Sequence, residues 1–202
     1  MSTSADALFA QPCNFVMGGV SLEALPPQHY PEIAFAGRSN VGKSSLVNAL
    51  TGQKTLAHAS NTPGRTRELN FFLLAEKLML VDLPGYGYAK AGRKDVKKWN
   101  DLVMAYLSGR PNLKRVLLLI DSRHGLKEND FTTMALLDEA AVSYQIVLTK
   151  LDKIRASDAE EVLKETLAKL KKHPAAMMEV ISTSSEKKTG ISELRQSLAA
   201  FV

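Results

Sequence analysis

The sequence predicts an α/β protein with a mostly parallel sheet and helices on both of its faces. Short apolar runs alternate with stretches of helical periodicity along the 202 residues. Strand and helix patterns in alternation imply right-handed crossovers between parallel strands. The segment from Ala75 to Lys77 separates two apolar runs and predicts one antiparallel hairpin. Ligands on such folds bind beyond the carboxyl ends of the strands, so motifs at those positions deserve most weight.

Apolar runs and 3.6-residue periodicity place the individual elements. Six strands are expected, at residues 33–36, 69–74, 78–81, 116–120, 145–148 and 178–181. Helices are expected at residues 43–50, 93–107, 128–140, 156–171 and 191–199. Residues 1–30 are interpreted as an N-terminal arm packed on or flanking a single domain at 31–202, and their own structure is left open.

Composition limits the class of protein before any motif is considered. The chain is 45% hydrophobic and 23% charged, which excludes collagen-like and intrinsically disordered proteins. The single cysteine cannot form an intrachain disulfide, which favours a reducing compartment. Neither a membrane-length apolar run nor a secretory leader is visible. We therefore expect a soluble, cytoplasmic, monomeric protein without a membrane anchor.

The segment directly after the first strand matches the phosphate-loop pattern G-x-x-x-x-G-K-[ST]. It comprises Gly37, Arg38, Ser39, Asn40, Val41, Gly42, Lys43 and Ser44. The glycines let the backbone curl so that its N–H groups cradle phosphate oxygens, and the following helix adds its positive dipole end. Lys43 is expected to reach the β- and γ-phosphates, and Ser44 to bind Mg²⁺. A chance match is on the order of 1% at average residue usage.

Two further segments at strand ends extend the nucleotide hypothesis. Asp82, Leu83, Pro84 and Gly85 follow the third strand, where the aspartate can hold the Mg²⁺ shell through water and the Gly85 N–H can meet a γ-phosphate. On its own, such an aspartate is more often a turn or cap residue. The flexible segment 61–67 contains Thr66, which can contact Mg²⁺ and the terminal phosphate as a γ-phosphate sensor. His58, in the same loop, is expected to be solvent-exposed.

The base is indicated by Thr149, Lys150, Leu151 and Asp152, which follow the fifth strand. A carboxylate there can accept hydrogen bonds from N1–H and the exocyclic amine of guanine, whereas adenine would leave it unpaired. The lysine stem can cover the base plane. Alone, the tetrapeptide could equally cap the next helix. After the last strand, Thr183, Ser184 and Ser185 are small enough to let backbone N–H groups approach the guanine carbonyl.

Together these segments resemble the translation-factor-like class of GTPases and, within it, the EngB/YihA/YsxC family of bacterial ribosome-assembly GTPases. The resemblance extends from about residue 14 to the C-terminus. It rests on the phosphate loop, residues 62–66, Asp82-Leu83-Pro84-Gly85-Tyr86-Gly87-Tyr88, residues 149–152 and Asp121-Ser122-Arg123-His124.

That resemblance implies a Ras-like P-loop GTPase domain that binds GTP or GDP. Catalytic roles are expected for Lys43, Thr66 and Gly85, and Mg²⁺ binding for Ser44 and Thr66. Further nucleotide contacts are expected along the loop formed by Gly64, Arg65, Thr66, Arg67 and Glu68. The implied partner is the large ribosomal subunit or its precursor, and the family is associated with cell division and septation.

Two positions, Tyr86 and Thr149, depart from the usual GTPase motifs, although the EngB-like family also shows this threonine; Asn40 suggests a further ligand. Tyr86 stands where Ras-like signalling proteins carry the glutamine that orients the attacking water, which predicts slow intrinsic hydrolysis. Thr149 replaces the asparagine usual in the guanine motif, so its tie to the phosphate loop is expected to be weaker. Asn40 is compatible with K⁺ beside the β- and γ-phosphates, where a cation offsets charge in the transition state.

The net charge of +5 is local rather than spread over the chain. Eight basic and only two acidic residues lie between Tyr86 and Arg115, directly after the expected γ-phosphate sensor. This segment can be a solvated helix face or a surface for RNA. A GTP-hydrolysing switch that docks on the ribosome is the leading hypothesis. The alternatives are a nucleotide-dependent scaffold in the division machinery, a membrane-tethered signalling GTPase and a P-loop kinase; the last two lack their expected motifs.

Overall fold

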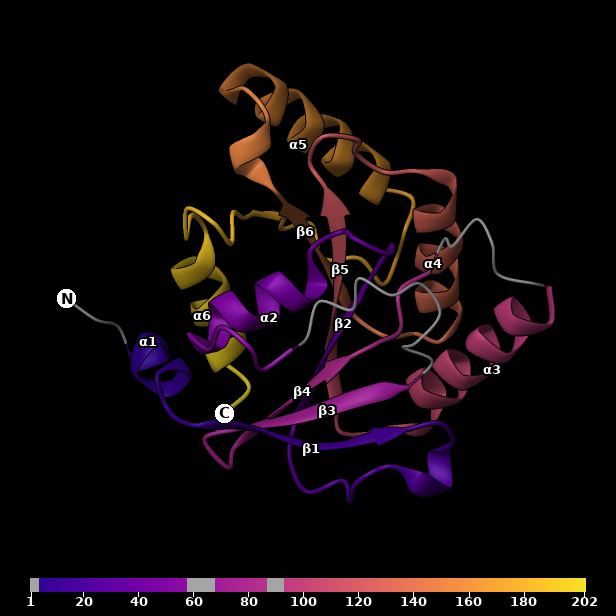
Figure 1. Ribbon diagram of the computed structural model, residues 1–202. Coiled ribbons are helices and arrows are strands. Elements are labelled where there is room, and N and C mark those ends of the chain that lie inside the picture. Colours follow the sequence, from indigo (N-terminus) through magenta and orange to yellow (C-terminus); the bar gives the residue numbers. More distant parts are fainter. Residues whose placement is uncertain (1–3, 58–67, 87–92) are drawn as a thin grey trace.

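One seven-stranded sheet carries the fold, with its strands in the order β1-β3-β4-β2-β5-β6-β7 (Figure 1). The computed structural model describes residues 4–57, 68–86 and 93–202, with the backbone alone over 93–99. Neighbours from β4 to β7 pair in parallel, whereas β3 is antiparallel to both β4 and β1. The predicted α/β class, the mostly parallel sheet and the hairpin at Ala75 are therefore confirmed.

The strands have the following bounds: β1 Cys13–Gly19, β2 Glu32–Gly37, β3 Leu69–Leu74, β4 Leu78–Asp82, β5 Leu113–Asp121, β6 Tyr144–Thr149 and β7 Ile181–Ser182. The α-helices have these bounds: α1 Ser4–Phe9, α2 Lys43–Thr51, α3 Arg93–Gly109, α4 Glu128–Glu139, α5 Ala156–Leu170 and α6 Ile191–Ala199. Two 3₁₀ turns, Leu22–Ala24 and Leu151–Lys153, complete the described elements.

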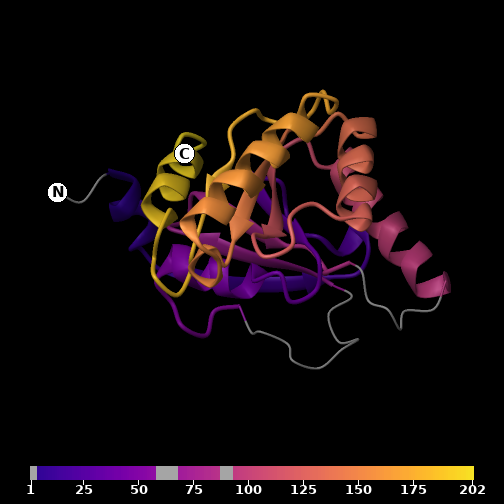
Figure 2. The same cartoon turned by 90° about the horizontal axis from the view of Figure 1, so that it is seen from above.

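The helices divide between the two faces of the sheet (Figure 2). Along β5, Leu118 and Ile120 pack in the core beneath α3, α4 and α5, whereas Leu117 and Leu119 pack beneath α1, α2 and α6. Successive side chains of a strand point to opposite faces, so a strand covered on both faces is apolar throughout. This explains why β5 reads as a continuous apolar run.

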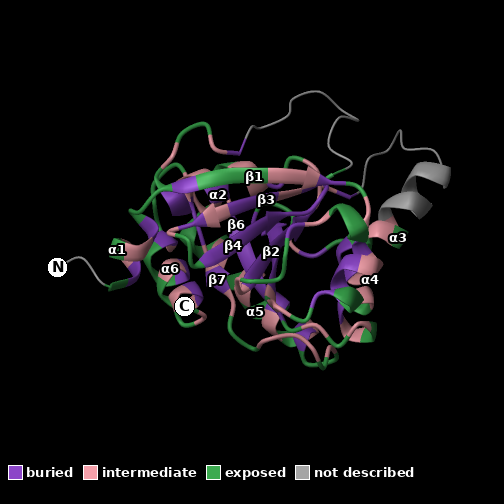
Figure 3. Ribbon diagram, turned by 90° about the horizontal axis from the view of Figure 1, so that it is seen from below, coloured by how far each residue is buried: buried purple, intermediate pink, exposed green. Residues whose placement is uncertain are grey.

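The sheet has one strand more than the six that the sequence predicts, because β1 pairs with β3 along its length. Its side chains do not alternate: Cys13 is buried, but Phe15 and Val16 are both exposed on this edge (Figure 3). Without a period of two, no strand pattern is visible in the sequence. The arm extends the sheet at one edge, and its α1 lies against α6 through Asp6, which pairs with Arg195 at 3.0 Å.

The last strand is also shorter and later than predicted. The pattern at 178–181 suggested a strand there, whereas β7 comprises only Ile181 and Ser182, and Met178 is exposed. Only two residues of β6 pair with it, so its signal in the sequence is weak. None of the helices in the described parts of the chain is both long enough and apolar enough to span a bilayer.

Candidate functional site

The phosphate loop connects the carboxyl end of β2 to the first turn of α2. Gly42 lies in the left-handed region with φ 109°, and Asn40 with φ 61°, which curls the backbone between them. The Leu46 N–H donates to Gly42 O at 2.9 Å, so the helix begins directly after this glycine. The loop therefore places the positive end of the α2 dipole at the carboxyl edge of the sheet.

Lys43 and Asp82 face one another across this loop. Lys43 Nζ lies 3.4 Å from Asp82 Oδ1, and both side chains are largely buried. Burial raises the pKa of Asp82 above its ordinary value, and the neighbouring Lys43 charge opposes that rise. Within the described residues, Asp82 Oδ1 accepts no hydrogen bond. A buried carboxylate whose Oδ1 has, among the residues described, only the ion pair with Lys43, beside the phosphate loop, fits the water shell of a Mg²⁺ ion.

The segment after β4 is bonded directly to the phosphate loop. Tyr86 N–H donates to Gly37 O at 3.3 Å, and Tyr86 O accepts the Ser39 N–H at 3.0 Å. A Cβ on Gly85 would lie 3.2 Å from both Ser39 N and Ser39 Cα, closer than most Cβ contacts, so Ser39 would have to shift to admit a side chain. Leu83, fully within the core, and Pro84 lead into this close approach. Gly85 is thus wedged against the loop that holds the phosphates.

Thr149 is tied to the phosphate loop through its hydroxyl. Its hydroxyl donates to Val41 O at 2.7 Å, and the side chain is buried. Lys150 Nζ donates to Asn40 O at 2.6 Å and pairs with Asp121 Oδ2 at 2.9 Å. The threonine hydroxyl thus reaches the same loop that the lysine holds, whereas the strength of this tie relative to that of the usual asparagine stays a prediction. Both residues connect the expected base site to the expected phosphate site.

Asp152 and the segment after β7 form one hydrogen-bonded unit. Ser184 Oγ donates to Asp152 Oδ1 at 2.5 Å, and Lys153 Nζ lies 3.1 Å from Asp152 Oδ2. The Ser184 hydroxyl, followed by the Lys153 ammonium, lowers the pKa of Asp152 below its ordinary value. The carboxylate is therefore ionised at neutral pH, as acceptance of two guanine N–H groups requires.

The three residues after β7 have different roles in this unit. The N–H groups of Thr183 and Ser184 donate to Leu148 O and Thr189 O, so neither is available to a base. Leu151 N–H donates in turn to Thr183 O at 3.0 Å, which joins the two segments. Among the described residues no acceptor is found for the Ser185 N–H. Of the three, Ser185 is thus the one whose N–H can meet a guanine carbonyl.

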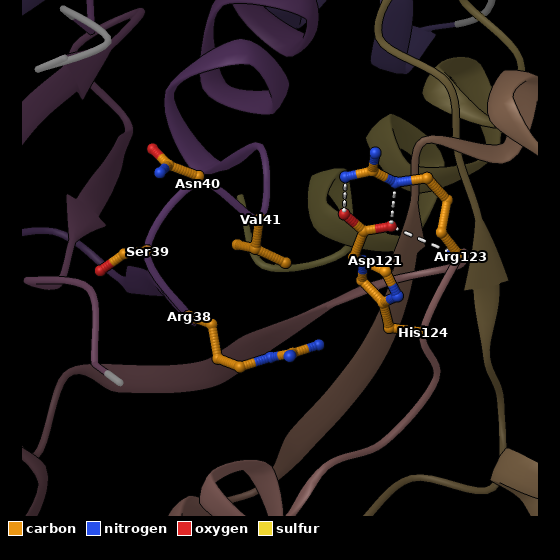
Figure 4. A pocket seen from close by; sticks show the side chains of 7 residues that line it. All are labelled: Arg38, Ser39, Asn40, Val41, Asp121, Arg123 and His124. Carbon is orange, nitrogen blue, oxygen red and sulfur yellow. Dashed lines mark hydrogen bonds and ion pairs between the residues drawn. The ribbon is translucent and has the colours of Figure 1, made fainter. Parts of the chain in front are cut away.

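A cavity of about 240 Å³ lies between the phosphate loop and the connection from β5 to α4 (Figure 4). Its walls comprise Arg38, Ser39, Asn40, Val41, Asp121, Arg123 and His124. Burial alone would raise the pKa of Asp121, but hydrogen bonds from Arg123 and Lys150 outweigh burial and keep that pKa below its ordinary value. The cavity is smaller than the ~300–1,000 Å³ of small-molecule pockets, so it can hold only part of a ligand.

Several predicted site residues cannot be placed. Gly64, Arg65, Thr66 and Arg67, together with His58, lie outside the described residues. Glu68 is described and exposed, directly before β3. The expected Mg²⁺ ligand Ser44 lies in the first turn of α2, beside Lys43.

Two acidic residues near the site were not among the predicted site residues. Asp121 ends β5 and binds the Lys150 side chain, so the rule of carboxyl strand ends could have indicated it. Asp130, on α4, accepts a hydrogen bond from the Tyr86 hydroxyl at 2.8 Å. In the sequence it resembles an ordinary acidic residue of a first helical turn, which gave no signal of this contact.

The basic segment is also smaller than its charge count suggests. Arg110 is buried in an ion pair with Glu32, at the amino end of β2. Arg115 bonds to Gln145 and Ser197, and Lys114 precedes it at the amino end of β5. Amino ends of parallel strands lie at the edge opposite the phosphate loop. These three residues therefore do not extend a basic surface beside the site, which leaves Lys90, Arg93, Lys94, Lys97 and Lys98, whose side chains lie outside the described residues.

A phosphate loop bonded to Tyr86, Thr149 and Lys150, on the carboxyl edge of a parallel sheet, defines a P-loop nucleotide-binding protein. The family described as 50S ribosome-binding GTPase matches residues 32–150. A relative from Rhodospirillum rubrum, named "Probable GTP-binding protein EngB", is 63% identical over 199 residues, covering 96% of this chain and 86% of the relative. A Caulobacter vibrioides relative of the same name is 59% identical, covering 95% and 84%. The chain belongs to the EngB family of GTP-binding P-loop GTPases.

Solved structures agree with this assignment. The crystal structure of an EngB GTP-binding protein has a TM-score of 0.67 and 25% identity, covering 84% of this chain and 97% of that one. The elongation factor SelB from Methanococcus maripaludis, in complex with the GTP analogue GppNHp, has a TM-score of 0.64 at 19% identity, covering 88% of this chain and 34% of its own. The latter similarity concerns the fold alone.

Proposed function

We propose that this protein is a Mg²⁺-dependent, slowly GTP-hydrolysing switch that acts in the cytoplasm as a monomer during assembly of the large ribosomal subunit. The observation that carries the proposal is the set of bonds from Thr149 and Lys150 to the phosphate loop. These bonds join a guanine-selective carboxylate, Asp152, to a phosphate cradle in one rigid unit. A role in normal cell division and septation follows from the ribosomal function in this proposal.

In this function Lys43 compensates the charge of the β- and γ-phosphate oxygens, and the Gly85 N–H contacts the γ-phosphate. Ser44 and Thr66 hold the Mg²⁺ ion, with Asp82 bound to its water shell. When bound, Mg²⁺ neutralises the charge that develops between the β- and γ-phosphates. Transfer of the γ-phosphoryl group to water needs positioning and charge stabilisation rather than a protein nucleophile.

Slow intrinsic hydrolysis is supported by the position of Tyr86. Its ring is buried among core residues and its hydroxyl is bonded to Asp130, so it points away from an attacking water. The site therefore lacks the side chain that orients water in Ras-like proteins. A second component, such as the ribosomal partner or a cation, is needed to complete it.

The cation is K⁺ in this proposal, held beside the β- and γ-phosphates with Asn40 as one ligand. Asn40 is exposed on the phosphate loop (Figure 4), which leaves its side chain accessible to an ion. We expect GTP hydrolysis to be faster in K⁺ than in Na⁺ at equal ionic strength, and Asn40→Ala to remove the difference. The initial rate of phosphate release measures this effect. Equal rates for the wild-type protein in the two salts would contradict the role of K⁺.

Docking on ribosomal RNA or protein is assigned to the basic segment from Lys90 to Lys98. This segment follows Gly85 directly, so the state of the nucleotide can alter its position. Phosphate-rich RNA attracts such a surface through charge, in a salt-dependent way. The second candidate, a scaffold in the division machinery that binds nucleotide without turnover, differs in two measurable properties. It would neither hydrolyse GTP nor sediment with ribosomal fractions.

A further inference from the structure

Asp130 lies outside the nucleotide site, yet it joins two parts of it. Its Oδ1 accepts the Tyr86 hydroxyl at 2.8 Å, and its Oδ2 lies 3.4 Å from Arg38 Nε. The Lys127 N–H also donates to Oδ2, at 2.8 Å. The Asp130 side chain is fully buried, and Tyr86 is only 8% exposed. We call these three side chains, Arg38, Tyr86 and Asp130, the anchor cluster.

Helix capping does not account for this cluster. The bond from the Lys127 N–H uses only one carboxylate oxygen and would suffice to cap α4. The other oxygen receives a phenol hydroxyl from the segment after β4, and a guanidinium approaches from the phosphate loop. A buried carboxylate is costly unless donors or opposite charges compensate it, so the Tyr86 hydroxyl and the Arg38 charge both stabilise Asp130 at this position. Asp130 thus links two segments of the nucleotide site, at Arg38 and Tyr86, to helix α4.

The anchored side chains fix the backbone that meets a γ-phosphate. Tyr86 is bonded to Gly37 O and Ser39 N–H through its own N–H and carbonyl. Gly85 is wedged against Ser39 in the same contact. If Tyr86 lost its anchor, the peptide between Gly85 and Tyr86 could shift away from the loop. The Gly85 N–H would then be misplaced for the γ-phosphate, whereas the cradle at residues 40–44 would remain.

We propose that Asp130 is a positioning residue for the γ-phosphate. It holds Tyr86 and Arg38 so that the Gly85 N–H can donate to the γ-phosphate of GTP. GDP has no γ-phosphate, so its binding does not depend on this position of Gly85. Asp130 acts through these residues and does not touch the nucleotide. The inference rests on the proposed role of Gly85 as γ-phosphate sensor. This role of Asp130 would connect the nucleotide to helix α4, an element that lies outside the phosphate-loop and guanine motifs.

The test measures dissociation constants for GDP and for the non-hydrolysable analogue GppNHp, using the full chain. The variants are Tyr86→Phe, Asp130→Asn and the two combined. We expect the affinity for GppNHp to fall by about tenfold in Tyr86→Phe, which removes a hydrogen bond to a charged group. Asp130→Asn should lower it by less, because its amide oxygen still accepts the Tyr86 hydroxyl in a weaker, neutral bond. We expect GDP affinity to change by less than about twofold. The double variant should resemble Tyr86→Phe, because that change already removes the bond that Asp130→Asn weakens.

Asp138→Asn is the matched control, because Asp138 lies on the same helix but bonds to His173 and to the Ala175 N–H, not to the phosphate loop. It should lower stability without changing the ratio of the two affinities. Tyr86→Phe retains the buried ring, so the test remains decisive if Asp130→Asn does not fold. An unchanged affinity ratio in Tyr86→Phe would overturn the proposal. Because GppNHp binding needs no hydrolysis, absence of GTP turnover in the wild type would contradict the proposed function and not this inference.

Discussion

Asp152→Asn is expected to weaken GDP binding by about 100-fold or more and to allow xanthosine diphosphate to bind instead. The carboxylate is the only group in the motif that can accept both N1–H and the exocyclic amine of guanine. The amide oxygen can still accept one N–H of guanine, but this bond is no longer charge-assisted. The amide NH₂ faces the second N–H of guanine, so the second bond is lost altogether. Xanthine carries an oxygen in place of that amine, which the amide can meet. Competition with fluorescent GDP measures both affinities.

Asp158→Asn is the control for this change. Asp158 is an exposed aspartate on α5, six residues after Asp152. Among the residues that the structure describes, the only hydrogen bond to its carboxylate comes from the Ser157 hydroxyl. It should bind GDP like the wild type. Because Ser184 and Lys153 lower the pKa of Asp152, the wild-type affinity should also stay constant as the pH falls toward the ordinary aspartate range near 4. Unchanged GDP affinity in Asp152→Asn would refute the guanine assignment.

Arg110→Ala is expected to lower the free energy of unfolding by about 3–5 kcal/mol. The Arg110 guanidinium is paired with Glu32 in the core, and its Nη1 also donates to Pro26 O at 3.0 Å. The Tyr106 hydroxyl donates to the same Glu32 carboxylate at 2.9 Å. Loss of the arginine leaves a buried charge without a partner, which costs more than the pair contributes. Chemical denaturation measures the change.

The double variant Glu32→Gln/Arg110→Met should recover part of this loss, because no uncompensated charge remains. Arg155→Ala, at an exposed position before α5, should alter stability by no more than about 0.5 kcal/mol. If Arg110→Ala were as mild as Arg155→Ala, the buried pair would not contribute to the fold. Arg110 directly follows α3, so in that case apolar packing alone would hold the C-terminal end of this helix.

The parts of the fold that the sequence predicts are those with a strong local period. β5 is covered on both faces, so it contains an unbroken apolar run from Val116 to Ile120. β1 could not be predicted, because its pairing with β3 depends on a long-range contact and its exposed Phe15 carries no pattern. β7 was misplaced for a related reason: only two residues pair, and neighbouring apolar residues such as Met178 stay outside the sheet.

The candidate site divides in the same way. The phosphate loop and the guanine motif are contiguous in sequence, so spacing alone reveals them. The hydroxyl of Thr149 could not be assigned its partner, because Val41 is more than a hundred residues away in the chain. The charge count included Arg110 in the basic segment, because the sequence does not show that Glu32 pairs with it in the core. Asp130 shows the same limit, since its contacts with Arg38 and Tyr86 arise only when α4 packs beside the loop.

The central claim, a GTP-dependent switch on the large ribosomal subunit, is tested most directly by co-sedimentation with large-subunit precursors. The wild-type protein is bound to GppNHp or to GDP, and a variant with Lys94→Glu and Lys98→Glu serves as comparison. We predict that the GppNHp form sediments with the precursors, that the GDP form largely stays behind, and that charge reversal removes binding without changing nucleotide affinity. Equal sedimentation in both nucleotide states, or none in either, would contradict the account.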